Sequence, residues 1–244
     1  MVMKNKRAIL LLALLFSISI SLAAEKSLVT LAESESTTAI VLIGGLNKNY
    51  HFLKEWETQL KDGDASVYGL DDDFRSISLK DSSWHLAVSL AALADKKKNH
   101  LVIIAHSLGG LVAKHALGRL NDFGLLTRFR KVELHAMGSP WGGSYTANIV
   151  PYLPFYRSVV ELIGYPMILD IGSESDFMRS LFARLPSNVS FYLYEGTEDT
   201  VSKPETESTR ERYEASATSA TSRTVLRGMN HNGFKKPFPI YFDW

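Results

Sequence analysis

The sequence predicts an α/β fold, in which a mostly parallel sheet carries helices on both faces. Short continuous apolar runs, such as those at 39–43 and 101–105, are typical of strands buried on both faces. Segments with helical spacing separate these runs, as crossover connections between parallel strands require. The 244 residues are 45% hydrophobic and 22% charged, the composition of one globular domain with a sizeable core.

Strands and helices alternate along the chain. The strands are expected at 39–43, 65–68, 101–105, 131–137, 189–194 and 223–226. The helices are expected at 50–60, at 84–94 with Asp81, Ser82 or Ser83 as N-cap, at 108–120, and from Pro204 to Ala217. A parallel sheet places its functional loops at the carboxyl ends of its strands, so functional residues are expected in the loops that follow strands.

The N-terminus has the pattern of a secretory signal peptide over residues 1–23. Lys4 to Arg7 form a basic region, Ala8 to Leu22 an apolar region, and Ser21-Leu22-Ala23 a cleavage site. The alternative is a membrane anchor, but the apolar run is shorter than the ~20 residues that a span prefers. We expect export to the periplasm or medium after cleavage near Ala23, a short segment at 24–38, and one domain at 39–244.

The composition excludes several classes of function. The absence of cysteine rules out disulfides, thiolate metal ligands and a cysteine nucleophile. A formal net charge of +1 gives no reason to expect nucleic acid as a partner. The sequence has no metal-ligand pattern and no phosphate-binding glycine loop, so no metal and no cofactor are expected. No obligate protein partner is inferred.

Ser107 occupies the junction between an expected buried strand and an expected helix, in the sequence Ala105-His106-Ser107-Leu108-Gly109. A strand that reverses sharply into a helix exposes a serine hydroxyl beside free helical N–H groups, and it needs small residues two positions before and after. Ala105 departs by one methyl group from the usual glycine. Ser107 could alternatively be a simple N-cap. We expect His106 to be a packing or turn residue.

A nucleophilic serine needs a histidine base and a carboxylate that orients it. His231 lies in a polar turn after the last expected strand, and Asp199 follows the strand at 189–194. The other histidines are expected to be structural (His115, His135) or to lie solvated or capping near helix ends (His51, His85, His100). The alternative carboxylates are Glu198, Glu195, Asp170 and Asp176. Both His231 and Asp199 could also be ordinary turn residues.

An oxyanion that develops on the substrate needs two N–H donors. The first is expected from Leu108, directly after the serine. The second is expected from the loop after the first strand, where Leu46 is favoured and Gly45 is the alternative.

These motifs, in this order, resemble the α/β-hydrolase superfamily and its lipase and esterase branch. The segment at 138–144, Gly-Ser-Pro-Trp-Gly-Gly-Ser, is similar to the strand-6 loop of lecithin-cholesterol acyltransferase-type lipases. The resemblance implies an α/β-hydrolase fold with nucleophile, acid and base in the order Ser107, Asp199, His231. The sequence departs from the pattern at Gly44, where a histidine is common. The short N-terminal segment implies a compact sheet of six or seven strands.

Residues 144–170 are expected to form a short apolar cap insert over the site. This segment is aromatic and proline-rich, with Val159, Leu162 and Ile163 at helical spacing. Tyr152 and Phe155, together with Trp141 of the preceding loop, are expected to bind substrate. The cap could also touch a lipid interface transiently. The alternative is an ordinary core helix.

The sequence therefore predicts a serine hydrolase that cleaves carboxylic or lipid esters through an acyl-enzyme on Ser107. His231 would be the general base and Asp199 would orient it. One alternative is an acyltransferase that passes the acyl group to a lipid alcohol. Another is a catalytically inactive binding protein on a hydrolase scaffold.

Overall fold

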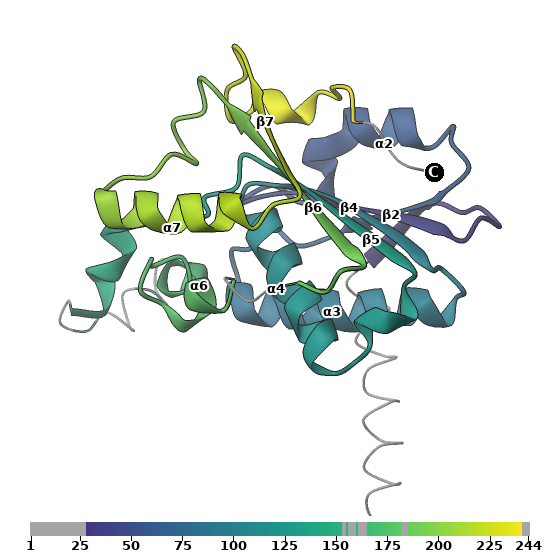
Figure 1. The fold of residues 1–244 in the computed structure, drawn as a ribbon, viewed down its shortest axis with the longest axis horizontal. Coiled ribbons are helices and arrows are strands. Elements are labelled where there is room, and N and C mark those ends of the chain that lie inside the picture. The colour runs from purple at the N-terminus through teal and green to yellow at the C-terminus, as the bar shows by residue number, and fades with distance from the viewer. Residues whose placement is uncertain (1–27, 153–154, 156–159, 161–164, 182–184, 241–244) are drawn as a thin grey trace, which may run out of the picture.

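A computed structural model describes residues 28–152, 155, 160, 165–181 and 185–240. The described chain contains a seven-stranded sheet in the order β1-β3-β2-β4-β5-β6-β7, with helices on both sides (Figure 1). Strand β1 is antiparallel to β3, and every other neighbouring pair is parallel. The predicted α/β class and the mostly parallel sheet are confirmed. The expected signal peptide lies outside the described residues.

The six expected strands are all present, with small differences at their ends. They are β2 (Thr38–Ile43), β3 (Ser66–Leu70), β4 (His100–His106), β5 (Lys131–Met137), β6 (Val189–Gly196) and β7 (Ser222–Leu226). A seventh strand, β1 (Leu28–Ala32), was not predicted and lies in the short N-terminal segment. Since β1 is an edge strand and only partly buried, it lacks the continuous apolar run that reveals the central strands.

The four expected helices are present, with differences at their ends. The helices in the described residues are η1 (Tyr50–Leu53), α2 (Lys54–Leu60), α3 (Leu79–Asp95), α4 (Leu108–Asp122), α6 (Asp176–Ser180) and α7 (Glu207–Thr218), besides short 3-10 turns. Of these, α6 is a short helix that the sequence did not predict. Helix α3 begins earlier than expected because Ser78 is its N-cap and accepts a hydrogen bond from the Asp81 amide. Ser82 and Ser83 lie buried inside this helix, so none of the three expected caps is the cap.

Two hydrophobic layers enclose the sheet. Val41 and Ile43 of β2 face a large core covered by α3, α4 and α7, whereas Ile40 and Leu42 face a smaller core beside α2. Figure 1 shows α3 and α4 on one side of the sheet and α2 on the other. Burial on both faces explains the continuous apolar runs. No helix in the described ranges is long and apolar enough to cross a membrane.

A charged network is buried within the sheet around Glu133 of β5. The Glu133 carboxylate lies 2.9 Å from His100 Nε2, 3.0 Å from Lys131 Nζ and 3.3 Å from His135 Nε2. Burial by itself raises the pKa of this carboxyl, but hydrogen bonds from the three partners outweigh burial and lower the pKa to about 2. The expectation of a solvated or capping His100 is wrong, because this ring is buried against Glu133.

The Glu133 network predicts a specific acid sensitivity. Because the folded-state pKa of about 2 lies below the unfolded value of about 4.3, ionised Glu133 stabilises the fold above pH ~4.3, and this stabilisation is lost toward pH ~2. Glu133→Gln should therefore be less stable than the wild type at pH 7, and the difference should shrink on acidification. Urea unfolding of both proteins between pH 7 and 3 measures it. A difference that stays constant would contradict this assignment.

Candidate active site

Ser107 lies at the sharp turn between β4 and α4. Its backbone has φ 55° and ψ −127°, a left-handed conformation that is strained for a residue with a side chain. Although Ser107 occupies the N-cap position of α4, its hydroxyl makes no capping hydrogen bond. The simple N-cap interpretation therefore does not describe this serine.

Small residues let three backbone segments meet at this turn. A Cβ on Gly109 would lie 2.2 Å from the Gly44 carbonyl oxygen, and one on Gly45 would lie 2.7 Å from Ser107 Cβ. The loop after β2 therefore packs directly against the serine. The one-methyl departure at Ala105 is accommodated, since Ala105 is fully buried at the end of β4.

Gly109→Ala is expected to lower the free energy of unfolding by about 1–3 kcal/mol, because the added methyl group meets a main-chain carbonyl that cannot rotate away. Gly118→Ala is the matched control on the same helix. A Cβ at Gly118 meets no atom of the described residues within 4 Å, so this change should stabilise the protein by up to about 1 kcal/mol. Thermal unfolding of both variants compares them, and equal effects would contradict the steric explanation.

The structure brings Ser107, Asp199 and His231 together from three separate loops. His231 Nε2 lies 3.1 Å from Ser107 Oγ, and His231 Nδ1 lies 2.9 Å from Asp199 Oδ2. These distances are within hydrogen-bond range, and the two ring nitrogens face different partners. The chain of contacts from carboxylate to imidazole to hydroxyl is the arrangement that can remove a proton from the serine.

Asp199 is held in place on both of its oxygens. Oδ1 accepts hydrogen bonds from the amides of Val201 and Ser202 at 2.9 and 3.1 Å, which leaves Oδ2 for His231. Burial raises the pKa of Asp199, but the hydrogen bond and charge of His231 and the Ser202 contacts outweigh it, so the net pKa is lowered. The Asp199 carboxylate is therefore ionised at neutral pH.

The alternative carboxylates have other partners or face solvent. Asp170 accepts the amides of Leu79 and Lys80 at the start of α3, and Glu195 pairs with Arg223. Glu198 is exposed, and Asp176 lies on the surface.

Two backbone hydrogen bonds join the loops that carry Asp199 and His231. The Glu198 amide donates to Met229 O at 3.0 Å, and the Thr197 amide donates to Leu226 O at 3.1 Å. Gly196 makes this approach feasible, because a Cβ there would lie 2.1 Å from Met229 O. The base and its carboxylate therefore belong to one connected unit at the ends of β6 and β7.

The expected oxyanion donors flank the serine. Leu108 is the first residue of α4, where helical amides have no partner within their helix. Leu46 follows Gly45, the residue packed against Ser107, and both leucines line a cavity that also contains the serine. This placement is compatible with two N–H groups converging on a carbonyl bound at Ser107.

Comparison with known proteins agrees with this fold. Residues 86–174, which include Ser107, match the family described as "Putative serine esterase (DUF676)". No curated protein sequence matches the chain. Among solved structures, an alpha/beta hydrolase enzyme from the metagenome of lagoon sediments at Mar Chica, Morocco, is 18% identical with a TM-score of 0.55, and the match covers 85% of this chain and 87% of that one. The chain has the α/β-hydrolase fold.

Two further solved structures are similar to this chain. A monoacylglycerol lipase of Paleococcus ferrophilus is 16% identical with a TM-score of 0.57, and the match covers 86% of this chain and 91% of the lipase. The mature form of a lipase of Bacillus licheniformis is 14% identical with a TM-score of 0.55, and the match covers 86% and 92% of the two chains. At these identities the likeness establishes the fold.

A cavity of about 380 Å³ opens beside Ser107 and His231. Apolar side chains form much of its wall, namely Leu46, Leu108, Pro140, Met167, Ile171 and Val201. Lys48, Lys203 and Glu205 add charge to the same wall. A cavity of this size and lining can hold a small ligand that has an apolar part and a polar part.

The structure does not place the expected substrate-binding aromatic residues in this cavity. Trp141 is fully buried in the large core, where it packs against Phe191 and lies near the Lys114 ammonium group. Trp141 is therefore a core residue and does not line the cavity. Tyr152 and Phe155 are 87% and 84% exposed and do not line the cavity either.

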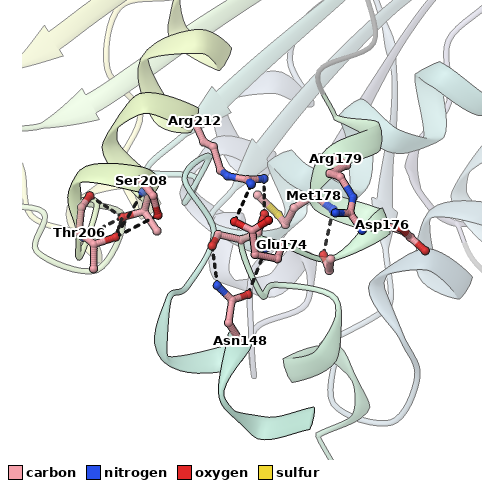
Figure 2. Close-up of polar contacts among 11 residues, drawn as sticks. Asn148, Glu174, Asp176, Met178, Arg179, Thr206, Ser208 and Arg212 are labelled. Atoms are coloured by element: carbon pink, nitrogen blue, oxygen red, sulfur yellow. Dashed lines mark hydrogen bonds and ion pairs between the residues drawn. The ribbon is translucent and has the colours of Figure 1, made fainter. Parts of the chain in front are cut away.

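A polar network holds the described part of the expected cap insert against the domain (Figure 2). Asn148 donates to Ser173 Oγ at 2.7 Å and accepts from the Glu174 amide at 3.1 Å. Arg212 of α7 in turn pairs with Glu174 at 2.7 Å. The base of the cap is therefore tied to α7. The expected helical positions Val159, Leu162 and Ile163 lie outside the described residues.

Proposed function

We propose that this α/β-hydrolase is a serine esterase that cleaves carboxylic esters through an acyl-enzyme. The observation that carries the proposal is the contact chain from Asp199 through His231 to a strained Ser107 at the edge of a cavity. The match to a family described as serine esterases supports the same reaction class, as do the lipases with similar structures.

The first half of the reaction forms the acyl-enzyme. Ser107 Oγ attacks the ester carbonyl while His231 Nε2 takes the hydroxyl proton, and the Asp199 carboxylate stabilises the resulting imidazolium. The amides of Leu108 and Leu46 donate to the tetrahedral oxyanion. The intermediate collapses when His231 returns the proton to the alcohol oxygen, which leaves with its bond to carbon broken.

The second half releases the acid. A water molecule attacks the acyl carbonyl while His231 removes its proton, and the proton then passes to Ser107 Oγ as the acyl–serine bond breaks. The serine is restored, and the net reaction consumes one ester and one water and yields one acid and one alcohol.

The cavity supports an apolar acyl group of modest size as the substrate's acid portion. Its volume of about 380 Å³ is near the lower end of the range for small-molecule sites, about 300–1,000 Å³. The exposed Ile149, Tyr152 and Phe155 on the cap segment support transient contact with a lipid surface. Export to the periplasm or medium, which rests on the N-terminal sequence, would bring the enzyme to such substrates.

A chain-length series of 4-nitrophenyl esters tests the proposal. The purified protein should hydrolyse these esters and release nitrophenolate in an initial burst when deacylation is slow. We expect kcat/KM to pass through a maximum at short or medium acyl chains and to fall for chains that exceed the cavity. No turnover at any chain length, with the protein folded, would contradict the proposed function.

A further inference from the structure

His106 lies next to the candidate nucleophile, yet the proposed mechanism does not use it. From the sequence, only a packing or turn role is expected for this residue. The residue is 1% exposed, and its ring centroid lies 4.5 Å from that of Phe52 and 4.6 Å from that of His231. It therefore fills the space between the helical turn η1 and the loop that carries the base.

The ring of His106 is bonded to the main chain of His231. His106 Nε2 lies 2.9 Å from the His231 carbonyl oxygen. Because a carbonyl only accepts, Nε2 must carry the hydrogen. Burial lowers the pKa of His106 to about 3, and the nearby His231 contributes to the lowering. The ring is therefore a neutral Nε2–H tautomer at neutral pH.

The other nitrogen of the ring has no such partner. His106 Nδ1 is buried without a hydrogen-bond partner in the described part of the chain. This nitrogen faces the loop after β2, since a Cβ on Gly45 would lie 3.3 Å from it. A buried acceptor without a donor is unfavourable, and an apolar side chain would avoid this cost. The presence of an imidazole at position 106 is thus explained by the hydrogen bond that its Nε2–H donates to the His231 carbonyl oxygen, and not by packing.

We propose that His106 is a positioning residue that fixes the main chain of His231 relative to Ser107. The base is 124 positions from the serine in sequence, and His106 is covalently attached to that serine. A single hydrogen bond from this ring therefore links the nucleophile and the base over a short rigid path. The inference rests on the proposed function.

The neutral state of His106 matters to the same role. During the reaction His231 becomes a cation, and a second cation with its ring centre 4.6 Å away would oppose this step. A neutral donor holds the loop without repelling the imidazolium. Lysine or arginine at this position could donate the same bond but would bring the charge.

The test compares His106→Gln, which can place an N–H near the position of Nε2, with His106→Leu, which cannot donate. We expect His106→Leu to lower kcat by roughly 10- to 100-fold, because small misplacement of a reacting group can cost about 10²-fold. His106 is one of the residues that line the cavity, so KM is expected to change as well, but less than kcat, because leucine keeps a side chain of similar size there. His106→Gln should recover most of the lost kcat. Labelling by a fluorophosphonate should slow in the leucine variant in parallel with kcat.

His115→Leu is the matched control. His115 is another buried histidine, and its Nδ1 lies 2.6 Å from Ser83 Oγ, between α3 and α4 and away from the cavity. This variant should lose thermal stability without losing kcat in the folded protein. If His106→Leu does not fold, His106→Asn replaces it, because the shorter amide cannot reach the His231 carbonyl.

The outcomes separate the two proposals. If the wild type is active and His106→Leu or His106→Asn keeps full kcat, the positioning role is overturned and the esterase proposal stays intact. The same holds if His106→Gln is as impaired as these variants. An inactive wild type would instead overturn the proposed function. Selective loss of kcat that glutamine restores supports the role of His106.

Discussion

Replacing Ser107 with alanine is expected to lower kcat for ester hydrolysis by about 10⁴- to 10⁶-fold, the range seen when a serine hydrolase loses its nucleophile. The change removes the only atom of the site that can form the acyl bond in the proposed mechanism. The fold should be retained, since within the described part of the chain the serine hydroxyl bonds only to His231 and caps no helix. Steady-state hydrolysis of the best 4-nitrophenyl ester measures the effect.

Ser139→Ala provides the matched control for Ser107→Ala. Ser139 is also a buried serine in a loop at the carboxyl edge of the sheet, and its hydroxyl has no hydrogen-bond partner in the described structure. The control should keep wild-type activity. If Ser107→Ala remained as active as Ser139→Ala, Ser107 would not be the nucleophile.

Asp199→Asn is expected to lower kcat by about 10⁴-fold while leaving the fold nearly unchanged. Because Asp199 Oδ1 accepts two backbone amides, the asparagine oxygen should take that position and the amide NH₂ should face His231. The NH₂ group would then donate to Nδ1 and leave the ring hydrogen on Nε2. A histidine in this tautomer cannot accept the serine proton.

Glu198→Gln is the control for Asp199→Asn, since it removes one negative charge at the adjacent, exposed position. It should retain kcat within about twofold, as surface charges act weakly through water. Equal losses in both variants would show that general charge near the loop matters rather than the contact between Asp199 and His231.

Local chemistry explains which parts of the fold the sequence could predict. The runs at 39–43 and 101–105 are apolar throughout because both faces of β2 and β4 are buried, so the sequence pattern alone predicts these two strands. Strand β1 lacks this pattern because it lies at the edge of the sheet, and its pairing with β3 depends on contacts distant in sequence. The N-cap of α3 was missed because several serines and an aspartate there are equally good caps.

The candidate site likewise has parts that the sequence could predict and parts that it could not. The proximity of Ser107, Asp199 and His231 was predictable because each follows a strand of one parallel sheet, and such strands end at a common edge. Trp141 was misassigned because a turn sequence does not specify which side of the sheet its side chain enters. The contact between His106 and the main chain of His231 leaves no signal in either segment, since a carbonyl is present at every residue.

Covalent labelling with a fluorophosphonate tests the central claim most directly, because this reagent reacts with a serine that a nearby base activates and needs no knowledge of the natural ester. Intact-mass and peptide analysis should show one phosphonyl group on the peptide that contains Ser107 in the wild type. The same reaction should be strongly slowed in His231→Ala. Labelling of another residue, or equal labelling rates in folded wild type and His231→Ala, would contradict the account.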